Sequence, residues 1–564
     1  MKLLWLWSIL FGASTVATMA LPLLAQTPTD PNTDRFPQTS PTPVPLPSDS
    51  TPKPTITPSP EPGSPDDGKS VVISEVKVIG STVLTDTNWG AIVKPLVGQT
   101  KTIAELKTIA DRLTQLYLDR GEITSRVVIV TPIDGGKITF QAIEGSVEQI
   151  NILGLIKLKP NYIRSRLALV TNTPLNINKL EDQLRLLRAD PLVSNIEASL
   201  KAGSGVGKSI LTVRATEANP FSVNLTADNY SPPSVGSERV GASIEYRDPT
   251  GELGSVDINY NRTVPSGSDL YDLSYKIPLN PMQGTLQARI APNSSQISAA
   301  PFQVLDFKSR SQLYELSYRQ PFIRSLREEF ALSWGVAIQK NETSIGNIPT
   351  PFSVGPDAQG VSQTTVLKFG QDYVKRDPRG AWGMRSLLNF GVGIFGATIN
   401  NKPTPDGRFF SWQGQVQRVQ ILSPDQLLIA QLDAQLTPNP LLPIHQFAIG
   451  GGQSVRGFRQ NARAADNGIK LSLEDRITIG RDPAGNQTLA LAPFVDAGWV
   501  WNQGDNPNLI PRQNFIAGLG LGVIWQPLPK LNLRVDYGLP LVNLSDRGNN
   551  LQDSGLYFSI NYQP

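Results

Sequence analysis

Few residues of this chain could support covalent catalysis. Its 564 residues include no cysteine and a single histidine, His445. Thiolate nucleophiles, cysteine zinc sites and serine–histidine triads therefore lack the residues they need, and we expect no enzyme activity, no metal and no cofactor. His445 follows Pro443 and Ile444, which favours a structural residue near the end of a strand.

Carboxylates such as Asp257, Glu474 and Asp536 could be proposed as acid–base pairs. Each lies in a stretch where polar and apolar residues alternate, as in a β-strand with one face in water. A water-filled barrel accepts charge at every second residue without any catalysis, and we prefer this interpretation. Asp475 is different, because it falls on the apolar face of its own strand, and only a bulge or a strand end would account for it.

A formal dinucleotide-binding pattern, G-x-G-x-x-G, occurs at Gly391, Gly393 and Gly396. In a nucleotide-binding unit such glycines open a helix and approach a pyrophosphate. No helix pattern follows here, and strand-like alternation runs through the motif. We interpret the three glycines as small residues on the lumen side of a strand, like the alternating glycines of residues 518–522.

Two short motifs offer an arginine and an aspartate. The first, V-R-G-F at residues 455–458, lies in a long glycine-rich connection at 450–466. Long loops of this kind are usually functional. The second, F-V-D-A-G at residues 494–498, lies in a strand pattern whose large apolar residues are on the opposite face. We therefore predict that Asp496 points inward if those apolar residues meet lipid.

The elements that must position these motifs begin after a long N-terminal stretch. An apolar run followed by small residues predicts a secretory signal peptide over residues 1–25. Residues 26–70 are dense in proline, threonine and serine, which predicts an extended, disordered linker.

No later apolar run approaches the length of a membrane helix. Basic and acidic residues nearly balance, 51 against 48, without a basic cluster, so we expect no nucleic-acid partner.

Residues 71–219 contain one module twice. The segments at 76–80 and 138–144 recur at 150–154 and 211–217. In the first copy Thr102 and Glu105 form a capping box for an amphipathic helix between predicted strands at 71–79, 126–131 and 137–144. In the second copy Leu180, Leu184 and Leu187 form the equivalent helical stripe. We predict two small α+β modules, at 71–146 and 147–219.

The remainder of the chain, residues 220–564, has the period-two alternation of β-strands. Residues 330–338 and 531–537 place large apolar side chains on one face and small or polar ones on the other. One face suits lipid and the other suits water, unlike a sandwich with a dry inner face. Since only helices or closed barrels satisfy the backbone in a bilayer, we predict a transmembrane antiparallel barrel of about 16 strands.

The tandem modules resemble POTRA domains, the periplasmic modules of outer-membrane export and assembly barrels. With both motifs in order, residues 71–564 resemble the two-partner secretion transporters of the haemolysin-activator family (ShlB/FhaC/HecB), within the larger superfamily of barrel-assembly proteins. The residues that match are Val455, Arg456, Gly457, Phe458, Phe494, Asp496 and Gly498. Two features depart from the family: a proline-rich stretch stands where a plug helix is frequent, and the last strand is followed by Gln563 and Pro564 instead of ending in an aromatic residue.

The resemblance implies that the loop at 450–466 folds back into the barrel lumen. It also implies that Arg456 pairs with Asp496 on the wall and so holds the loop in its working position. A guanidinium can bind a carboxylate through two parallel hydrogen bonds, which a lysine would not reproduce. The alternative is a solvated arginine on an exposed loop, where a pair would contribute about 1 kcal/mol or less.

The function that the resemblance implies is export of a large, unfolded, β-rich partner protein from the periplasm to the cell surface. We expect a monomeric barrel in outer-membrane lipid, with periplasmic modules that receive the partner by strand addition at a sheet edge. Three alternatives stay open: an insertase for other outer-membrane proteins, which would share the lumen loop; a passive porin, which leaves the modules unexplained; and a surface hydrolase, for which no catalytic constellation is visible.

Overall fold

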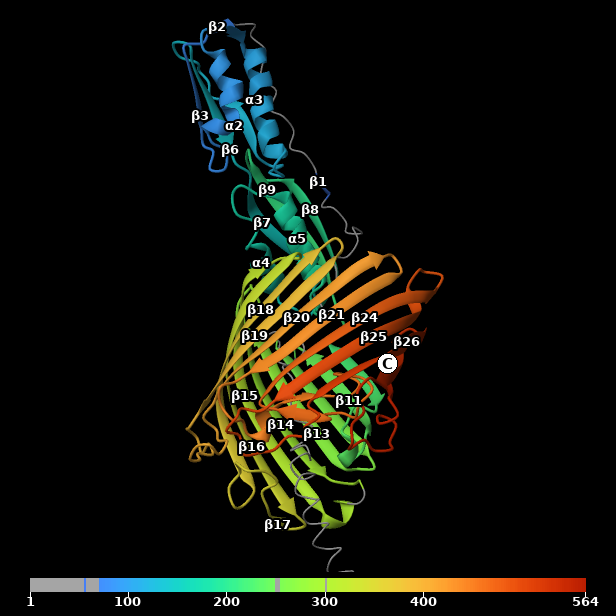
Figure 1. Cartoon of the computed structure of the whole chain (residues 1–564). Helices are drawn as coiled ribbons and strands as arrows, with labels where there is room; N and C mark the ends of the chain where they lie inside the picture. Colours follow the sequence, from blue (N-terminus) through green and yellow to red (C-terminus); the bar gives the residue numbers. More distant parts are fainter. Residues whose placement is uncertain (1–54, 57–69, 249–253, 300–301) are drawn as a thin grey trace, which may run out of the picture. The chain divides into compact units, whose positions relative to one another are not determined.

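The computed structural model describes residues 55–56, 70–248, 254–299 and 302–564 and contains two compact units (Figure 1). One unit includes the described residues up to Asn219, and the other begins at Pro220. The expected signal peptide and most of the expected linker lie outside the described residues. Within the linker, however, Thr55–Ile56 forms the short strand β1, and Ser70 begins β2.

The first module is a three-stranded sheet covered by two helices. The sheet order is β3-β6-β5, with β3 parallel to β6 and β5 antiparallel to it. The elements are β2 (Ser70–Val72), β3 (Glu75–Ile79), α2 (Asp86–Val93), η1 (Lys94–Leu96), β4 (Thr100–Thr102), α3 (Ile103–Leu118), β5 (Arg126–Ile129) and β6 (Lys137–Ile143). The single strand predicted over 71–79 is wrong, because β2 leaves this sheet and pairs with β4 instead.

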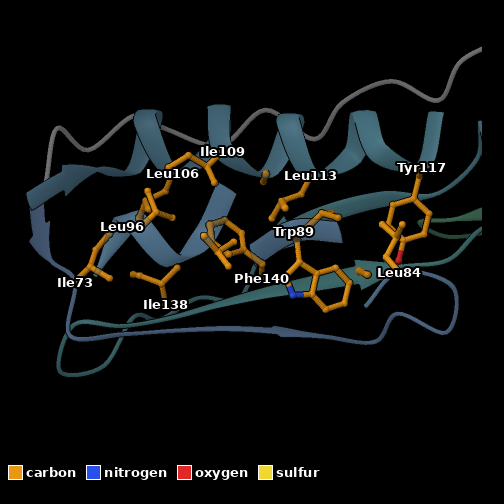
Figure 2. Packing of buried hydrophobic residues seen from close by; sticks show 14 residues of the cluster. Ile73, Leu84, Trp89, Leu96, Leu106, Ile109, Leu113, Tyr117, Ile138 and Phe140 are labelled. Carbon is orange, nitrogen blue, oxygen red and sulfur yellow. The ribbon is translucent and has the colours of Figure 1, made fainter. Parts of the chain in front are cut away.

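Helix α3 begins at the capping box that the sequence predicts. Thr102 Oγ1 accepts a hydrogen bond from the backbone N–H of Glu105, and a Glu105 carboxylate oxygen accepts from the N–H of Thr102. These bonds satisfy donors that a helix start otherwise leaves free. The inner face of α3 carries Leu106, Leu113 and Tyr117, which pack on the sheet (Figure 2).

The second module repeats this order. Its sheet is β1-β8-β9-β7, with β7 parallel to β9 and β8 antiparallel to it. The elements are β7 (Ser146–Leu153), α4 (Pro160–Leu167), α5 (Ile177–Arg188), β8 (Val193–Ala202) and β9 (Lys208–Glu217). The predicted stripe of Leu180, Leu184 and Leu187 is the buried face of α5.

The recurring sequence segments have the same structural task in both modules. Gly80 and Gly154 have φ values of 83° and 88°, and a Cβ at either would overlap the carbonyl oxygen of an alanine on the last strand. A glutamate at the end of β9, or just beyond the end of β6, accepts backbone N–H hydrogen bonds from the loop that follows β7 or β3. Glu144 binds the N–H of Thr82, and Glu217 binds the N–H groups of residues 156–158. The repeat therefore preserves one turn and its cap.

Sixteen antiparallel strands close the barrel, because the last strand pairs with the first. They are β10 (Phe221–Asp228), β11 (Glu238–Arg247), β12 (Ser255–Val264), β13 (Ser268–Pro278), β14 (Thr285–Gln296), β15 (Phe307–Arg324), β16 (Glu328–Ile345), β18 (Val361–Asp377), β19 (Gly380–Val392), β20 (Phe410–Ser423), β21 (Gln426–Leu436), β24 (Asn467–Arg481), β25 (Gln487–Trp501), β26 (Phe515–Leu528), β27 (Leu531–Pro540) and β28 (Leu556–Tyr562). A two-residue strand, β17 (Ile348–Pro349), pairs beside β16. The prediction of about 16 strands is confirmed.

The two faces of the barrel wall differ as the alternation predicts. Outward side chains such as Trp334, Leu471 and Val495 are large and solvent-accessible in the protein alone, as lipid-facing residues are. Inward side chains are small or form ion pairs, including Asp257 with Lys276 at 3.2 Å. Asp257 is thus one member of a wall ion pair.

Two expectations for single residues are wrong. Gly391 lies in β19, but Gly393 and Gly396 lie beyond its end at Val392, and Gly396 has a φ of 76° that suits a turn. Asp475 lies inside β24, and the register irregularity comes later, between Thr478 and Arg481. Its carboxylate accepts a hydrogen bond of 2.6 Å from Gln426 on the neighbouring strand, which satisfies one oxygen on the outward face.

Candidate functional site in the barrel lumen

The connection between β21 and β24 has a structured stem. It contains η4 (Pro443–His445) and a hairpin of β22 (Phe447–Ile449) with β23 (Arg463–Ala465). The expected lumen loop at 450–466 therefore includes strand β23 and is not wholly irregular. His445 lies at the end of η4, with its ring against Phe409 and 3.0 Å from the hydroxyl of Thr364, in a structural role.

Apolar contacts fix both ends of the V-R-G-F motif. Val455 and Phe458 belong to a buried cluster that also contains Phe447, Ile449, Ala465, Val500 and Ile516. Gly498 on β25 makes room for this cluster, since a Cβ there would come within 3.1 Å of the Val455 side chain. The space at Gly498 is therefore filled by the side chains of Val455 and Ile449.

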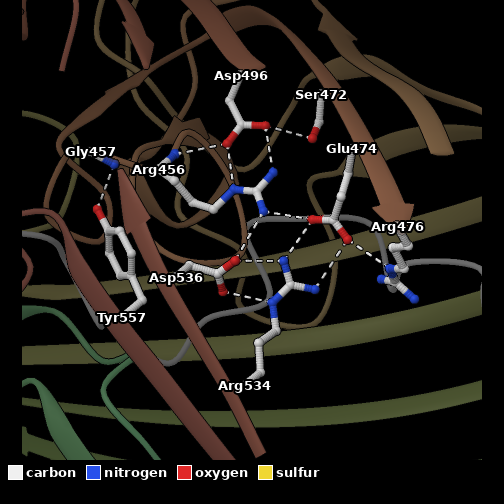
Figure 3. Close-up of polar contacts among 9 residues, drawn as sticks. All are labelled: Arg456, Gly457, Ser472, Glu474, Arg476, Asp496, Arg534, Asp536 and Tyr557. Carbon is white, nitrogen blue, oxygen red and sulfur yellow. Dashed lines mark hydrogen bonds and ion pairs between the residues drawn. The ribbon is translucent and has the colours of Figure 1, made fainter. Parts of the chain in front are cut away.

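Arg456 lies against Asp496 in the geometry of a bidentate pair (Figure 3). Its Nε donates to one carboxylate oxygen at 2.7 Å and its Nη2 donates to the other at 2.9 Å. The backbone N–H of Arg456 also donates to Asp496, at 3.1 Å. The guanidinium lies 3.4 Å from the centre of the Phe494 ring. Arg456 is 4% exposed and Asp496 is 0% exposed, so the pair is not solvated.

Two further carboxylates bind the same guanidinium. Nη1 of Arg456 donates to Glu474 on β24 at 2.7 Å and lies 3.5 Å from Asp536 on β27. Arg534 donates to both of these carboxylates, with the shortest contacts at 2.6 Å, and Arg476 donates to Glu474 at 2.8 Å. We call Arg456, Glu474, Asp496, Arg534 and Asp536 the lumen ion network. With Arg476 it contains three positive and three negative groups.

The balance of charges explains how the network can be buried. An isolated buried ion costs several kcal/mol of desolvation, and close partners with good hydrogen bonds offset that cost. Removing one partner leaves the others uncompensated, at a cost of about 3–5 kcal/mol. The network therefore favours one position of the loop strongly over others.

Tyr557 on β28 binds the loop backbone beside the arginine. Its hydroxyl accepts a hydrogen bond of 2.8 Å from the N–H of Gly457 and donates one of 2.6 Å to the carbonyl of Phe458. Gly457 has a φ of 102°, and a Cβ there would lie 3.0 Å from the backbone nitrogen of Pro540. A glycine is therefore required both by the backbone conformation and by the close approach to β27.

Glycines on the wall allow the loop backbone to approach it. A Cβ on Gly518 of β26 would overlap the carbonyl oxygen of Arg456, and one on Gly538 of β27 would come within 2.6 Å of the nitrogen of Gly457. Gly518 and Gly538 thus form the surface on which the loop rests.

Beyond the motif, the loop is bound to the connection between β27 and β28. Arg459 makes a bidentate contact with Asp553, at 2.9 and 3.0 Å, and Arg463 makes one with Asp546, at 2.8 and 3.0 Å. Gln552 accepts from the N–H of Gln460. Strands that lie far apart in the sequence are therefore joined through one loop.

Both units of the chain match models of known protein families. The family model described as haemolysin secretion/activation protein ShlB/FhaC/HecB matches residues 207–524, more than half of the chain, and the model of the ShlB-type POTRA domain matches residues 71–145. The chain belongs to the ShlB/FhaC/HecB family. The first module is accordingly a POTRA domain, and the second repeats its order of strands and helices.

Curated members of this family and a solved structure are similar over most of their length. The chain is 23% identical to the outer membrane transporter CdiB of Escherichia coli, over 78% of this chain and 74% of CdiB. It is 23% identical to the hemolysin transporter protein ShlB of Serratia marcescens, over 79% and 78%. The solved structure of CdiB from Escherichia coli superposes with a TM-score of 0.70 at 19% identity, covering 90% of this chain and 93% of that one.

Membership in this family establishes the cellular location of the protein. It is an outer-membrane transporter of the two-partner secretion type, with its barrel in the outer membrane and its POTRA domains in the periplasm. Within the described ranges, no helix is both long and apolar enough to span a bilayer. The same residues contain no cluster of histidine and carboxylate side chains that could hold a metal ion.

Proposed function

We propose that this transporter exports a large, extended, β-rich partner protein, and that Arg456 holds the lumen loop in the position that export requires. The observation that carries the proposal is the bidentate contact between Arg456 and Asp496 inside the barrel. A loop without function would not need a buried ion network, whose parts come from β24, β25 and β27.

Each residue of the site would have its own role in positioning the loop. Val455 and Phe458 anchor the motif in the apolar cluster, and Gly457 allows the backbone to pass β27. Arg456 and Asp496 set the orientation of the loop, with Phe494 as the surface under the guanidinium. Gly498 leaves space for Val455.

The remaining parts of the proposal concern partners and chemistry. We infer that the barrel works as a monomer in outer-membrane lipid and that it has no catalytic activity of its own. The absence of cysteine and the single histidine support transport without covalent chemistry. Folding of the partner outside the cell would bias the direction of travel without any nucleotide.

Co-expression in a heterologous bacterial host tests the export function. The genes beside the transporter gene are sequenced first. The transporter is then expressed with any large secreted protein that they encode, and this candidate partner is measured in the medium and at the surface. We expect the partner outside only when the transporter is present. If the partner stays in the periplasm while other outer-membrane proteins assemble better, the chain is an insertase and the export proposal is wrong.

A further inference from the structure

One edge of the second module already binds an extended piece of this chain. Strand β1, residues Thr55–Ile56, pairs in parallel with β8, so that Thr55 lies opposite Ser199 and Ile56 opposite Leu200. Strand β8 runs over ten residues and pairs with β9 along its other side. Figure 1 shows β1 beside β8 at the margin of this sheet. The backbone of the β8 edge therefore accepts an added strand.

The sequence around β1 keeps this pairing short. Pro52 and Pro54 precede it and Pro58 and Pro60 follow it. Proline has no N–H and cannot donate to a strand ladder, so none of these four residues can add a hydrogen-bond donor to the pairing. An added strand without prolines could pair along all of β8 and would form several times as many hydrogen bonds.

The side chains of β8 suit a strand acceptor. On β8, against which α5 packs, Ile196 and Leu200 are buried, while the opposite face carries the exposed Glu197 and Lys201. The edge is thus fixed in place and polar on its outer face. A partner strand would bind through its main chain, which tolerates many sequences.

We propose that the β8 edge is the receiving site for an extended strand of the exported partner, and that Thr55–Ile56 occupies it as a placeholder until that strand arrives. This inference rests on the proposed export function and names its binding site. The placeholder keeps an open edge covered, which prevents pairing with the wrong strands. Its shortness allows the partner to replace it.

A disulfide that holds the placeholder in place tests the inference. The chain contains no cysteine, so Thr55→Cys with Ser199→Cys creates one pair in the full-length protein. Neighbouring strands lie about 4.8 Å apart, within the range that a disulfide accepts. We expect the pair to cross-link on mild oxidation and partner secretion to fall roughly tenfold, because the edge stays covered. Reductant should restore it.

A matched control uses the other edge of the same sheet. Thr55→Cys with Asn151→Cys on β7 should neither cross-link nor change secretion. If the 55–199 pair cross-links and secretion is unchanged, the β8 edge is not the receiving site. If that pair does not cross-link under oxidation, β1 does not occupy the edge, and the inference is wrong. Secretion by the unmodified transporter reports on the export function separately, since its failure would appear without any cysteine.

Discussion

The guanidinium of Arg456 has more partners than a simple ion pair. It binds Asp496 through two nitrogens while its third contacts Glu474 and Asp536. Exchanging Arg456 and Asp496 would therefore place an aspartate beside two other carboxylates. For this reason we expect the double exchange to restore secretion only in part, and a neutral substitution is the cleaner test.

Arg456→Lys should impair secretion nearly as much as Arg456→Ala. A lysine carries the charge but presents one point of contact, and it cannot bind Asp496 and Glu474 with a planar fork. We expect roughly a tenfold loss of secreted partner for either variant, with a barrel that still assembles. The measurement is partner in the medium, with heat-modifiable migration of the barrel as the assembly control. Full activity of the lysine variant would show that charge alone suffices.

Tyr557→Phe removes one hydroxyl and should loosen the loop. The N–H of Gly457 and the carbonyl of Phe458 would both lose their partner while buried, at a cost of about 1–3 kcal/mol. We expect faster hydrogen exchange at residues 456–459. Tyr537→Phe is the matched control, since that side chain lies half-exposed on the outer face of β27. Equal rates of hydrogen exchange at residues 456–459 in the two variants would count against a role for Tyr557.

At the scale of single elements, Glu217 joins the end of β9 to the loop before α4. Burial alone would raise the pKa of this carboxyl, but the three N–H donors of residues 156–158 outweigh it and hold the pKa below its usual value. Stability from this cap is present above the unfolded pKa of about 4.3 and is lost as the pH falls toward the lowered folded value.

Glu217→Gln should therefore weaken protection of residues 156–158 at neutral pH and change little in acid. Hydrogen exchange of the two proteins, compared at the same pH, measures the difference. We expect the difference in protection between the two proteins to disappear as the pH falls below about 4. A gap that persists unchanged in acid would mean that the charge of Glu217 does not contribute.

The elements of the fold were largely predictable from the sequence. Alternation defines the inward face of β25 because the period of a strand is two, so Asp496 could be oriented from its neighbours alone. The capping box at Thr102 and the repeated glycines at Gly80 and Gly154 are likewise local signals. In contrast, β1 is two residues long within a proline-rich stretch, and only its partner β8 makes it a strand.

The lumen ion network was predictable only in part. Glu474 and Asp536 stand out as inward carboxylates, and Arg534 has the same parity as Asp536 on β27. Their convergence depends on the order of strands around the closed barrel and on how far the loop reaches. Neither is encoded in a local pattern. The contact of Tyr557 with Gly457, which spans 100 residues, was missed for the same reason.

At the scale of the whole molecule, the loop connects parts of the barrel that close it. Gln552 bonds to the loop at Gln460 and also to the carbonyls of Asn229 and Ser231, which follow the first strand. The pairing of β10 with β28 covers only four residue pairs. We call this β10–β28 pairing the seam. We expect the loop and the seam to be coupled, so that variants which release the loop also weaken the pairing of β10 with β28.

Gln552→Ala tests this coupling. It removes the bonds to the loop and to the segment after β10, and we expect faster hydrogen exchange in β10 and β28 than in the unmodified protein. Gln431→Ala, on a wall strand away from the seam, serves as the control. Unchanged exchange at β10 and β28 would show that the seam does not depend on these contacts.

The central claim, that Arg456 acts by holding the lumen loop in place, is tested most directly by replacing the ion pair with a covalent bond. Position 498 lies beside Val455, so Val455→Cys with Gly498→Cys can join loop and wall in a chain that has no other cysteine. In the Arg456→Ala background, our account predicts that oxidation restores secretion of the partner and that reductant abolishes it again. If the disulfide forms and secretion stays at the level of Arg456→Ala, the arginine does something other than hold the loop, and the account is contradicted.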